Sequence, residues 1–458
     1  MQNGKLSKRT WFNIVLFGLM GQVAWNVENM YFNTFLYKEI YSNGASQAAI
    51  DGAIPVMKAI SIMVALSAAT AVVTTFIMGT LSDKMSKRKV FISFGYIAWG
   101  IITAAFGIIS RDNVAAAFNL SDEVQILNAT VWTVIIMDSI MTFMGSTSND
   151  SAFNAWVTEV TDTKSRPKVE TVFAVLPIVA MGSVIALGSL AQSGTISYST
   201  FFISLGAFVV LCGIIGLFTL KDPEHTAPKE ESNYLSDLFY GISPSVIKEN
   251  SRLYLALVAG CFYSVAVQTF FPYILIYLQY VILPASSDMN MLSAGFIVPA
   301  VIAVAAMAVG IIGLLKLGDK KGKAFALIPS TVLFVLGLVA ATFAKDLLGV
   351  VIVAAPLVIG YAVIMILLNA AIRDFTPENK AGLFQGVRMI FYVLIPMIVG
   401  PAIGSYASAN SGVTYTDEYN VVQAAPTSYM FLYAGIVAAF VLVPLFFLVK
   451  KGFDSKEK

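Results

Sequence analysis

The sequence predicts an all-α membrane protein of twelve transmembrane helices, arranged as two six-helix bundles with both termini in the cytoplasm. The composition, the spacing of the apolar runs and the placement of the basic residues support this fold class. The chain has 458 residues, of which 57% are hydrophobic and 12% are charged. A soluble domain carries about 25% charged residues, so this composition leaves too little polar surface for a soluble enzyme.

Twelve apolar runs are long enough to cross the hydrocarbon core of a bilayer, which takes about 20 helical residues. Charged or turn-rich segments separate these runs, and their continuous apolar character excludes the alternating strands of a membrane β-barrel. The expected spans are 11–37, 54–82, 90–110, 128–158, 168–191, 199–220, 251–281, 291–316, 323–344, 346–372, 382–408 and 427–450.

The basic residues indicate the orientation of the spans. All 29 lysine and arginine residues fall on segments that would face the cytoplasm, except Lys38, Lys58, Arg111 and Lys345. This distribution follows the positive-inside rule, because cytoplasmic loops carry an excess of Lys and Arg. We therefore expect a multi-pass protein of the cytoplasmic membrane.

A long polar stretch divides the chain near its midpoint. We expect an N-terminal bundle over residues 1–220, a cytoplasmic loop over 221–250 and a C-terminal bundle over 251–458. The loops after the second and eighth spans, within 79–89 and 313–323, both carry a Gly, an Asp-Lys pair and further basic residues. Two parallel repeats around a midplane cavity are typical of an alternating-access transporter.

Other kinds of chemistry find little support in the sequence. The net charge of +2 gives no general attraction to nucleic acid. The cysteines, Cys212 and Cys261, lie in apolar runs, and His225 is the single histidine, so we expect neither a disulfide framework nor a metal site. The sequence contains no P-loop and no nucleophile–base pair. We therefore expect no enzyme activity and no cofactor.

The loop after the second span resembles the signature of the major facilitator superfamily, Gly-x-Leu-x-Asp-Lys/Arg-x-x-Lys/Arg-Arg-Lys/Arg. The resemblance implies the major facilitator fold, in which Gly79 lets helices pack closely and Asp83 anchors a cytoplasmic charge network. A solvated, positive-inside loop is the alternative reading. The other residues of this motif are Lys84 and Arg88, with Asp319 in the corresponding loop of the second half.

Two further stretches resemble the glycoside–pentoside–hexuronide:cation symporters, the melibiose permease group. Residues 149–161 resemble the fourth helix of that group, and residues 373–378 resemble the segment before its eleventh helix. The resemblance implies transport of a sugar or glycoside. It places Asp150 on the aspartate that holds sugar hydroxyls, while Asn154 stands where melibiose permease has a tryptophan.

The coupling site of that group is not matched. The alignment places Ala71 and Thr75 on the two aspartates that bind the coupling cation there, so by elimination we expect H⁺ coupling or facilitated passage. Glu28 in the first span is the candidate proton carrier, and a salt bridge to Lys58 is the alternative for it. Arg388 is the cation nearest to the place of the group's helix-11 lysine.

The fourth span carries a polar face. Ser146, Asp150 and Asn154 recur at i, i+4 and i+8 and so share one side of an α-helix. A carboxylate accepts charge-assisted hydrogen bonds from a vicinal diol, which predicts contact with a sugar. A hydrogen-bonded contact between helices is the alternative. Asp138 lies on a different stripe, which is either an access path or a structural contact.

The first span carries an amide stripe that includes Asn26 and Asn29, with Trp25 beside it. Lipid would leave these amides without partners, so we expect them to face the interior, where they bind a polyhydroxylated ligand or pack helices together. In the seventh span, Tyr263 and Gln268 are further candidates for the solute site, with an aromatic packing face as the alternative.

We therefore expect a secondary transporter that moves a small polar solute, a sugar or glycoside, by alternating access with a coupling proton. We expect it to act as a monomer in the lipid bilayer and to bind no nucleic acid. An exporter of drugs or metabolites on the same fold is one alternative, but such exporters favour large apolar pockets. A non-transporting membrane sensor is the other, but sensors normally add a soluble signalling domain.

Overall fold

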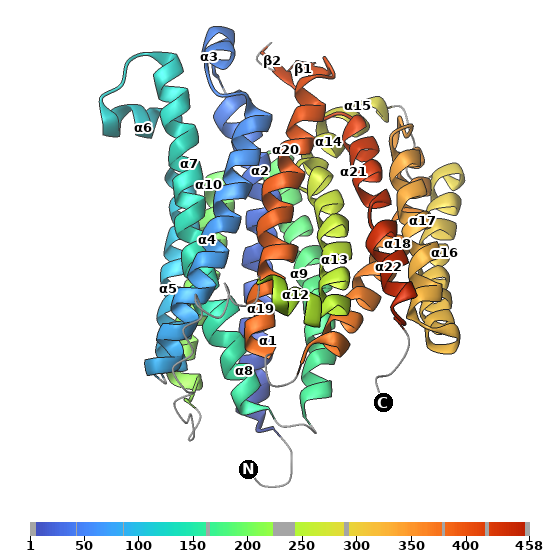
Figure 1. Ribbon diagram of the computed structural model, residues 1–458. Coiled ribbons are helices and arrows are strands. Elements are labelled where there is room, and N and C mark those ends of the chain that lie inside the picture. The colour runs from blue at the N-terminus through green and yellow to red at the C-terminus, as the bar shows by residue number, and fades with distance from the viewer. Residues whose placement is uncertain are drawn as a thin grey trace. The chain divides into compact units, whose positions relative to one another are not determined.

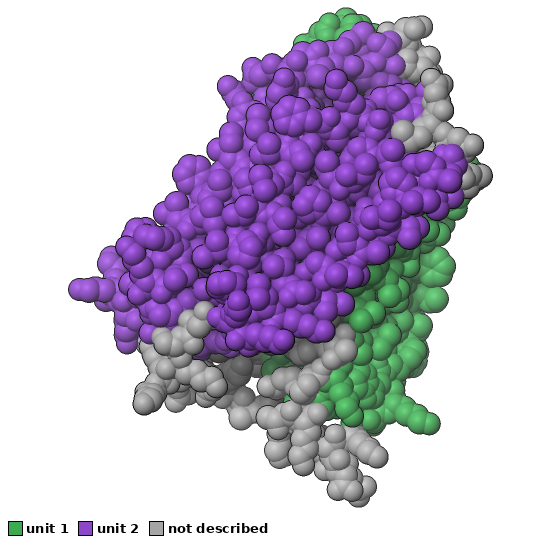
Figure 2. Space-filling model, turned by 90° about the vertical axis from the view of Figure 1, so that its right-hand side faces the viewer, with its two compact units in different colours: residues 1–234 green, residues 235–458 purple. Residues whose placement is uncertain are grey.

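The computed structural model of this chain is almost entirely helical (Figure 1). Its residues form two compact units, unit 1 within residues 1–234 and unit 2 within 235–458, which Figure 2 shows in green and purple. The predicted division at 221–250 falls largely on residues 223–242, which lie outside the described residues, as does His225. The structure describes residues 6–42, 44–85, 87–161, 165–222, 243–287, 293–377, 381–416 and 421–453.

Unit 1 is built of long helices, two of which change from α to π winding along their length. Its short helices α3 and α6 lie at one end of the unit and α8 lies at the other (Figure 1). In chain order the elements are α1 (Lys8–Asn26), η1 (Val27–Phe32), α2 (Asn33–Phe35), η2 (Leu36–Ser42), α3 (Gln47–Gly52), α4 (Val56–Met85), α5 (Arg88–Ala105), η3 (Phe106–Ile108), α6 (Arg111–Phe118), α7 (Glu123–Gly145), η4 (Ser146–Phe153), α8 (Asn154–Val160), α9 (Arg166–Gln192) and α10 (Tyr198–Thr219).

Unit 2 has the same helical character and adds one antiparallel hairpin, in which Tyr415 of β1 pairs with Gln423 of β2. Its elements are α12 (Pro244–Glu249), α13 (Ser251–Phe270), η5 (Phe271–Tyr273), α14 (Ile274–Tyr277), η6 (Leu278–Ile282), α15 (Leu283–Ala285), α16 (Ala294–Lys321), α17 (Lys323–Ala341), α18 (Leu347–Phe375), α19 (Ala381–Met389), η8 (Ile390–Leu394), α20 (Ile395–Ala409), β1 (Thr414–Thr416), β2 (Val422–Ala424), α21 (Tyr429–Ala439) and α22 (Leu442–Lys450).

Within the described residues, ten helices are long and apolar enough to cross a membrane. The other two expected spans, 11–37 and 168–191, do not reach that standard. Amides and Glu28 lower the hydropathy of the first, and in the second only Val175–Ala191 stands out as an apolar helix. The twelve-span count and the cytoplasmic termini therefore stay predictions. The ten helices are Val56–Gly79, Arg88–Ile108, Glu123–Val160, Tyr198–Thr219, Ser251–Ala285, Ala294–Lys321, Lys323–Ala341, Leu347–Phe375, Gly386–Ala409 and Tyr429–Lys450.

Small residues let the helices of unit 1 approach closely. A Cβ atom added to Gly100 of α5 would lie 2.5 Å from the carbonyl oxygen of Gly206 in α10, and one added to Gly206 would lie 2.4 Å from the carbonyl oxygen of Gly100. Lipid supplies no hydrophobic driving force between membrane helices. Close van der Waals packing at such contacts holds the helices together instead. The aromatic rings of Phe32 in η1 and Phe106 in η3 stack on each other, with centroids 3.8 Å apart.

Unit 2 uses the same kind of contact. A Cβ atom at Gly360 of α18 would lie 2.6 Å from the carbonyl oxygen of Ser330 in α17, and one at Gly404 of α20 would lie 2.1 Å from that of Thr269 in α13. Backbone therefore lies against backbone at these crossings. These close crossings fix the positions of the helices that carry the polar side chains described below.

We expect Gly206→Leu to lower the thermal unfolding midpoint of the purified protein, because overpacking a close contact costs about 1–3 kcal/mol or more. The matched control is Gly182→Leu in α9, since a Cβ atom there meets nothing within 4 Å. The midpoint, measured in detergent by fluorescence-detected size exclusion after heating, should be unchanged or raised in the control. An unchanged midpoint for the Gly206 variant would contradict this packing.

Candidate functional site

Asp150 lies in a π-helical segment of unit 1, η4, between α7 and α8. Its side chain is half-buried. The Ser146 hydroxyl donates a hydrogen bond to Asp150 Oδ2 at 3.1 Å, and the side chain of Trp25 from α1 lies beside the same carboxylate. The structure therefore brings Ser146, Asp150 and Trp25 together. Short π-helical segments within α-helices occur frequently at functional sites.

Asn154 follows Asp150 by one turn, at the start of α8. Its side chain is exposed, and its amide nitrogen donates to the backbone carbonyl oxygen of Asp150 at 3.2 Å. The i, i+4, i+8 prediction assumed α-helical winding with 3.6 residues per turn. In η4 the winding is wider, so the placement of Asn154 on the face of the carboxylate stays a prediction.

The amide stripe of the first helix is bound to its own backbone. Asn26 Nδ2 donates to the carbonyl oxygen of Gln22 at 2.7 Å, and Asn29 Nδ2 donates to that of Trp25 at 2.7 Å. Each bond uses one of the two amide hydrogens, and both side chains are half-buried. The Asn26 and Asn29 side chains thus keep an acceptor oxygen and one donor hydrogen for another partner.

Trp25 is held on an aromatic platform. Its ring centroid lies 5.1 Å from that of Trp99 in α5, and a Cβ atom at Gly145 would come within 3.0 Å of the Trp25 ring. Gly145 therefore leaves the space that the indole occupies beside the start of η4. This packing fixes the indole next to Asp150.

Glu28 lies in a second polar cluster of unit 1. It is 6% exposed, and its Oε1 atom accepts hydrogen bonds from Ser67 of α4 at 2.6 Å and from Thr142 of α7 at 2.9 Å. In the part of the chain that the structure describes, its Oε2 atom has no partner. The alternative salt bridge to Lys58 is wrong, because Lys58 is exposed and forms no ion pair with Glu28 among the described residues.

Asp138 belongs to the same cluster as Glu28. It is 2% exposed, lies within electrostatic reach of Glu28, and precedes Thr142 by one helical turn. The Thr142 hydroxyl lies 2.9 Å from the backbone carbonyl oxygen of Asp138. Among the described residues, Asp138 Oδ1 has no hydrogen-bond partner. The sequence predicts roles for Glu28 and Asp138 separately. It does not predict that the two carboxyl groups belong to one cluster.

Arg88, at the start of α5, is the best-defined member of the predicted conformational motif. It is 3% exposed and forms a salt bridge with Glu159 of α8, with Nη2 2.7 Å from Oε1. Its Nη1 atom donates to the Ser82 hydroxyl at 2.5 Å, and Ser82 donates in turn to the carbonyl oxygen of Gly79 at 3.1 Å. Sequence reasoning missed Glu159 as the partner, although it lies in the stretch that resembles the sugar symporters.

The remaining motif residues are less informative. The side chains of Asp83 and Lys84 lie outside the described residues. A Cβ atom at Gly79 would lie 3.4 Å from the Ser151 hydroxyl of η4, so this glycine lies at ordinary contact distance from the helix that carries Asp150. Asp319 is exposed near the end of α16.

In unit 2, Tyr263 is a packed residue of α13. It is 4% exposed, its hydroxyl donates to the backbone carbonyl oxygen of Tyr361 at 3.1 Å, and its ring lies 5.6 Å from that of Phe334. Gln268 is half-buried and lies against Gly400 of α20, where a Cβ atom would come within 2.6 Å of Gln268 Cβ. These contacts agree with helix packing for Tyr263.

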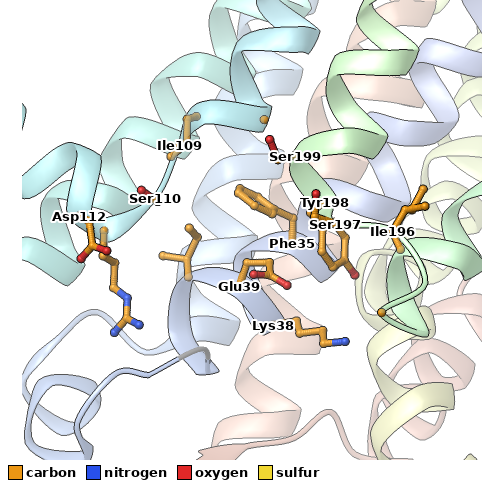
Figure 3. Close-up of a pocket in the computed structure, with 15 residues that line it drawn as sticks. Phe35, Lys38, Glu39, Ile109, Ser110, Asp112, Ile196, Ser197, Tyr198 and Ser199 are labelled. Carbon is orange, nitrogen blue, oxygen red and sulfur yellow. The ribbon is translucent and has the colours of Figure 1, made fainter.

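Unit 1 also has a cavity of about 490 Å³ at the end that carries α6 (Figure 3). Lys38, Glu39, Arg111 and Asp112 give it a mixed charge, and burial lowers the pKa of Arg111 while Asp112 and Glu123 oppose that shift. Figure 3 shows Glu39 between the first residues of α6 and those of α10. None of the predicted solute or coupling residues lines this cavity, so it is separate from the polar clusters described above.

Comparisons with known proteins point to one family and one fold. A sequence profile described as Major Facilitator Superfamily matches residues 10–395 and 316–458, whereas a comparison with curated proteins finds no match. The solved structure of the nucleoside transporter NupG shares 12% identity at a TM-score of 0.60, over 97% of this chain and 99% of that one. A bacterial homolog of the human lysosomal transporter Spinster, inward-facing and unoccupied, shares 11% identity at a TM-score of 0.62, over 99% and 100%.

We expect Glu159→Gln to destabilise the protein by about 2 kcal/mol, because it leaves the buried Arg88 charge without its counter-ion. The estimate is below that for a fully buried pair, since the Glu159 side chain is 22% exposed. Asp374→Asn is the matched control, because it breaks an exposed salt bridge to Lys323 and should cost less than about 1 kcal/mol. Equal shifts of the thermal midpoint in the two variants would contradict the prediction that the salt bridge between Arg88 and Glu159 stabilises the protein more than an exposed salt bridge does.

Proposed function

The chain belongs to the Major Facilitator Superfamily, and from that premise we propose that its solute is a sugar or glycoside and its coupling ion a proton. Membership makes the chain a multi-pass membrane protein and a secondary transporter of a small molecule, and it excludes an enzyme. The cytoplasmic membrane as its location and its placement in the melibiose permease group belong to the proposal.

The contact between Trp25 and the Ser146–Asp150 pair carries the proposal of a sugar. An ionised carboxylate offers about four lone-pair positions; Ser146 occupies one of them, and Trp25 lies beside the carboxylate. The half-buried side chain can therefore still accept hydrogen bonds from two neighbouring hydroxyl groups of a solute. The apolar face of an indole suits the C–H face of a sugar ring.

The amides of α1 support the same class of solute. Asn26 and Asn29 each retain an acceptor and a donor, which match hydroxyl groups that both donate and accept. Exporters of amphipathic drugs favour large apolar pockets, whereas a carboxylate, two amides and a hydroxyl favour a hydroxylated solute. A nucleoside is an N-glycoside, so it falls within the proposed class.

The cluster around Glu28 supports coupling to protons. Ala71, which stands in place of one cation-binding aspartate, offers no oxygen ligand. Glu28 lies within electrostatic reach of Asp138 from α7 and of Asp150, and no cation pairs with Glu28 among the described residues. Burying neighbouring carboxylates as anions is costly, so a proton held on Glu28 relieves the repulsion and can be exchanged during the transport cycle.

We expect Asp150→Asn to raise the KM for sugar uptake by about 10-fold or more, because one charge-assisted hydrogen bond contributes about 1.5–3 kcal/mol. Trp25→Phe keeps an aromatic ring but loses the indole N–H, so its KM should rise by a smaller factor. Uptake by proteoliposomes across a panel of sugars, glycosides and nucleosides measures both effects. The control is Asp51→Asn, on the exposed face of α3. Unchanged sugar uptake in Asp150→Asn would make Asp150 a structural residue.

We expect Glu28→Gln to abolish accumulation driven by a pH gradient while solute exchange at equal pH continues, because the amide cannot release a proton. Glu249→Gln, an exposed change in α12, should leave both activities intact. Proteoliposomes with an imposed gradient of pH, or of Na⁺ at constant pH, separate the two ions. Concentrative uptake driven by Na⁺ alone would refute proton coupling.

A further inference from the structure

The cavity of unit 1 lies where two candidate membrane spans meet a membrane surface. The span Arg88–Ile108 ends beside the cavity, and the span Tyr198–Thr219 begins at it. Ser110 and Ser197, which line the cavity, lie within two residues of these span ends, and an α-helix rises about 1.5 Å per residue. The headgroup layer of a bilayer is about 5–8 Å thick, so the cavity lies at its depth. We propose that the cavity binds an ethanolamine phosphodiester, the group that phosphatidylethanolamine presents at this depth.

The charges that line the cavity match a zwitterion. Four charged side chains line it, two of each sign: Lys38, Arg111, Glu39 and Asp112. Figure 3 shows Lys38 and Glu39 between Asp112 of α6 and Ser197 before α10. An ethanolamine phosphodiester carries one negative charge on its phosphate and one positive charge on its ammonium group, so each charge finds a counter-charge. A ligand with charge of one sign would be repelled by one of the two pairs.

The two cations suit the phosphate. A guanidinium has five N–H donors and an ammonium group has three. Each side chain can therefore bond to a phosphate oxygen and still keep a contact within the protein. Arg111, which is half-buried, already lies within electrostatic reach of Asp112 and Glu123. Its planar fork also fits two oxygens of one phosphate.

Two helices also begin at the cavity. The Ser110 hydroxyl accepts a hydrogen bond from the backbone N–H of Asn113 in α6 at 3.2 Å. The Ser197 hydroxyl accepts one from the backbone N–H of Thr200 in α10 at 3.0 Å. Both serines line the cavity. Because the first turn of a helix carries partial positive charge, these two helix ends add to the attraction that the two cations exert on a phosphate.

The two carboxylates suit an ammonium group that can donate hydrogen bonds. Glu39 is half-buried in the wall of the cavity, and Asp112 is exposed at its edge. The ammonium group of ethanolamine has three N–H donors, as that of lysine does, and bonds of this kind to a carboxylate are charge-assisted. The trimethylammonium group of choline has no N–H donor. The cavity should therefore prefer ethanolamine to choline.

An exposed apolar stripe beside the cavity suits the acyl chains of a lipid. Phe94, Ile101 and Ile108 recur at seven-residue steps along α5 and η3, and they are 55%, 57% and 64% exposed. Residues at i and i+7 lie on one face of a helix. Ile108 lies between Gly107 and Ile109, which both line the cavity. The stripe therefore reaches the cavity, and an ethanolamine phosphodiester without acyl chains would not use it.

Native mass spectrometry of the purified full chain in detergent measures the binding of single lipids. The probes are phosphatidylethanolamine, phosphatidylcholine and phosphatidylglycerol with the same acyl chains, together with glycerophosphoethanolamine, which is the headgroup alone. We expect phosphatidylethanolamine to bind about 10-fold more tightly than the other two lipids, since one charge-assisted hydrogen bond is worth about that factor. It should also bind at least about 10-fold more tightly than glycerophosphoethanolamine, because the acyl chains add buried apolar area.

Substitutions in the cavity should change binding in two distinguishable ways. Lys38→Gln removes a contact to the phosphate, so the affinities for phosphatidylethanolamine and phosphatidylcholine should both fall by about 10-fold. Glu39→Gln removes a contact to the ammonium group, so the preference for ethanolamine over choline should fall to less than about 3-fold. The matched controls are Lys345→Gln in unit 2 and Asp51→Asn in α3, both exposed, and they should keep the wild-type affinities.

The outcomes decide between the cavity, its source of ligand and a general affinity for lipid. A preference for phosphatidylethanolamine that both cavity variants change and both controls keep supports the site. If glycerophosphoethanolamine binds as tightly as the lipid, the ligand is a soluble phosphodiester and the membrane source is wrong. If the three lipids bind equally, or if the preference is unchanged in both cavity variants, the proposed site is wrong. If one variant does not fold, the wild-type preference and the other variant decide. The assay contains no solute, so its result does not depend on the proposed sugar transport.

Discussion

A polar group inside a membrane span has no water to bind, so it must find its hydrogen-bond partner within the protein. Most of the polar side chains in unit 1 meet this constraint locally, as Asn26 and Asn29 do by donating to carbonyl oxygens one turn earlier. Asp150 meets it through Ser146. Among the described residues, the buried carboxylate oxygens without a hydrogen-bond partner are Glu28 Oε2 and Asp138 Oδ1, and these are where an exchangeable proton has chemical use.

Two π-helical segments of unit 1 carry candidate functional residues. Glu28 and Asn29 lie in η1, and Asp150 lies in η4 together with Ser146. A π-helical turn holds more residues than an α-helical turn, so it changes which side chains share a face. Regular four-residue spacing placed Ser146 beside Asp150 correctly, and Asn154 donates to the backbone one turn earlier, as Asn26 and Asn29 do. Periodicity predicts faces only while the winding stays constant.

The composition and the apolar runs predicted a helical membrane protein, because burial in lipid leaves a strong signal along the chain. Pairings between helices leave no such signal. The salt bridge between Arg88 and Glu159 and the bonds from Ser67 and Thr142 to Glu28 join residues 39–114 positions apart, and nothing in the local sequence specifies these partners. The amides and Glu28 of the first helix belong to the candidate site, and they also lower the hydropathy of that helix. The polar residues that suggest a function therefore weaken the evidence that the first helix spans the membrane.

The salt bridge between Arg88 and Glu159 has a consequence for the kinetics of alternating access. Both residues belong to unit 1, so a motion of one unit against the other leaves their bond intact throughout the cycle. In a rigid-body motion of that kind, the free energy of the bond contributes equally to the states before and after the motion. Such a bond stiffens the moving body without raising the activation barrier between these states, and the turnover rate does not depend on breaking it.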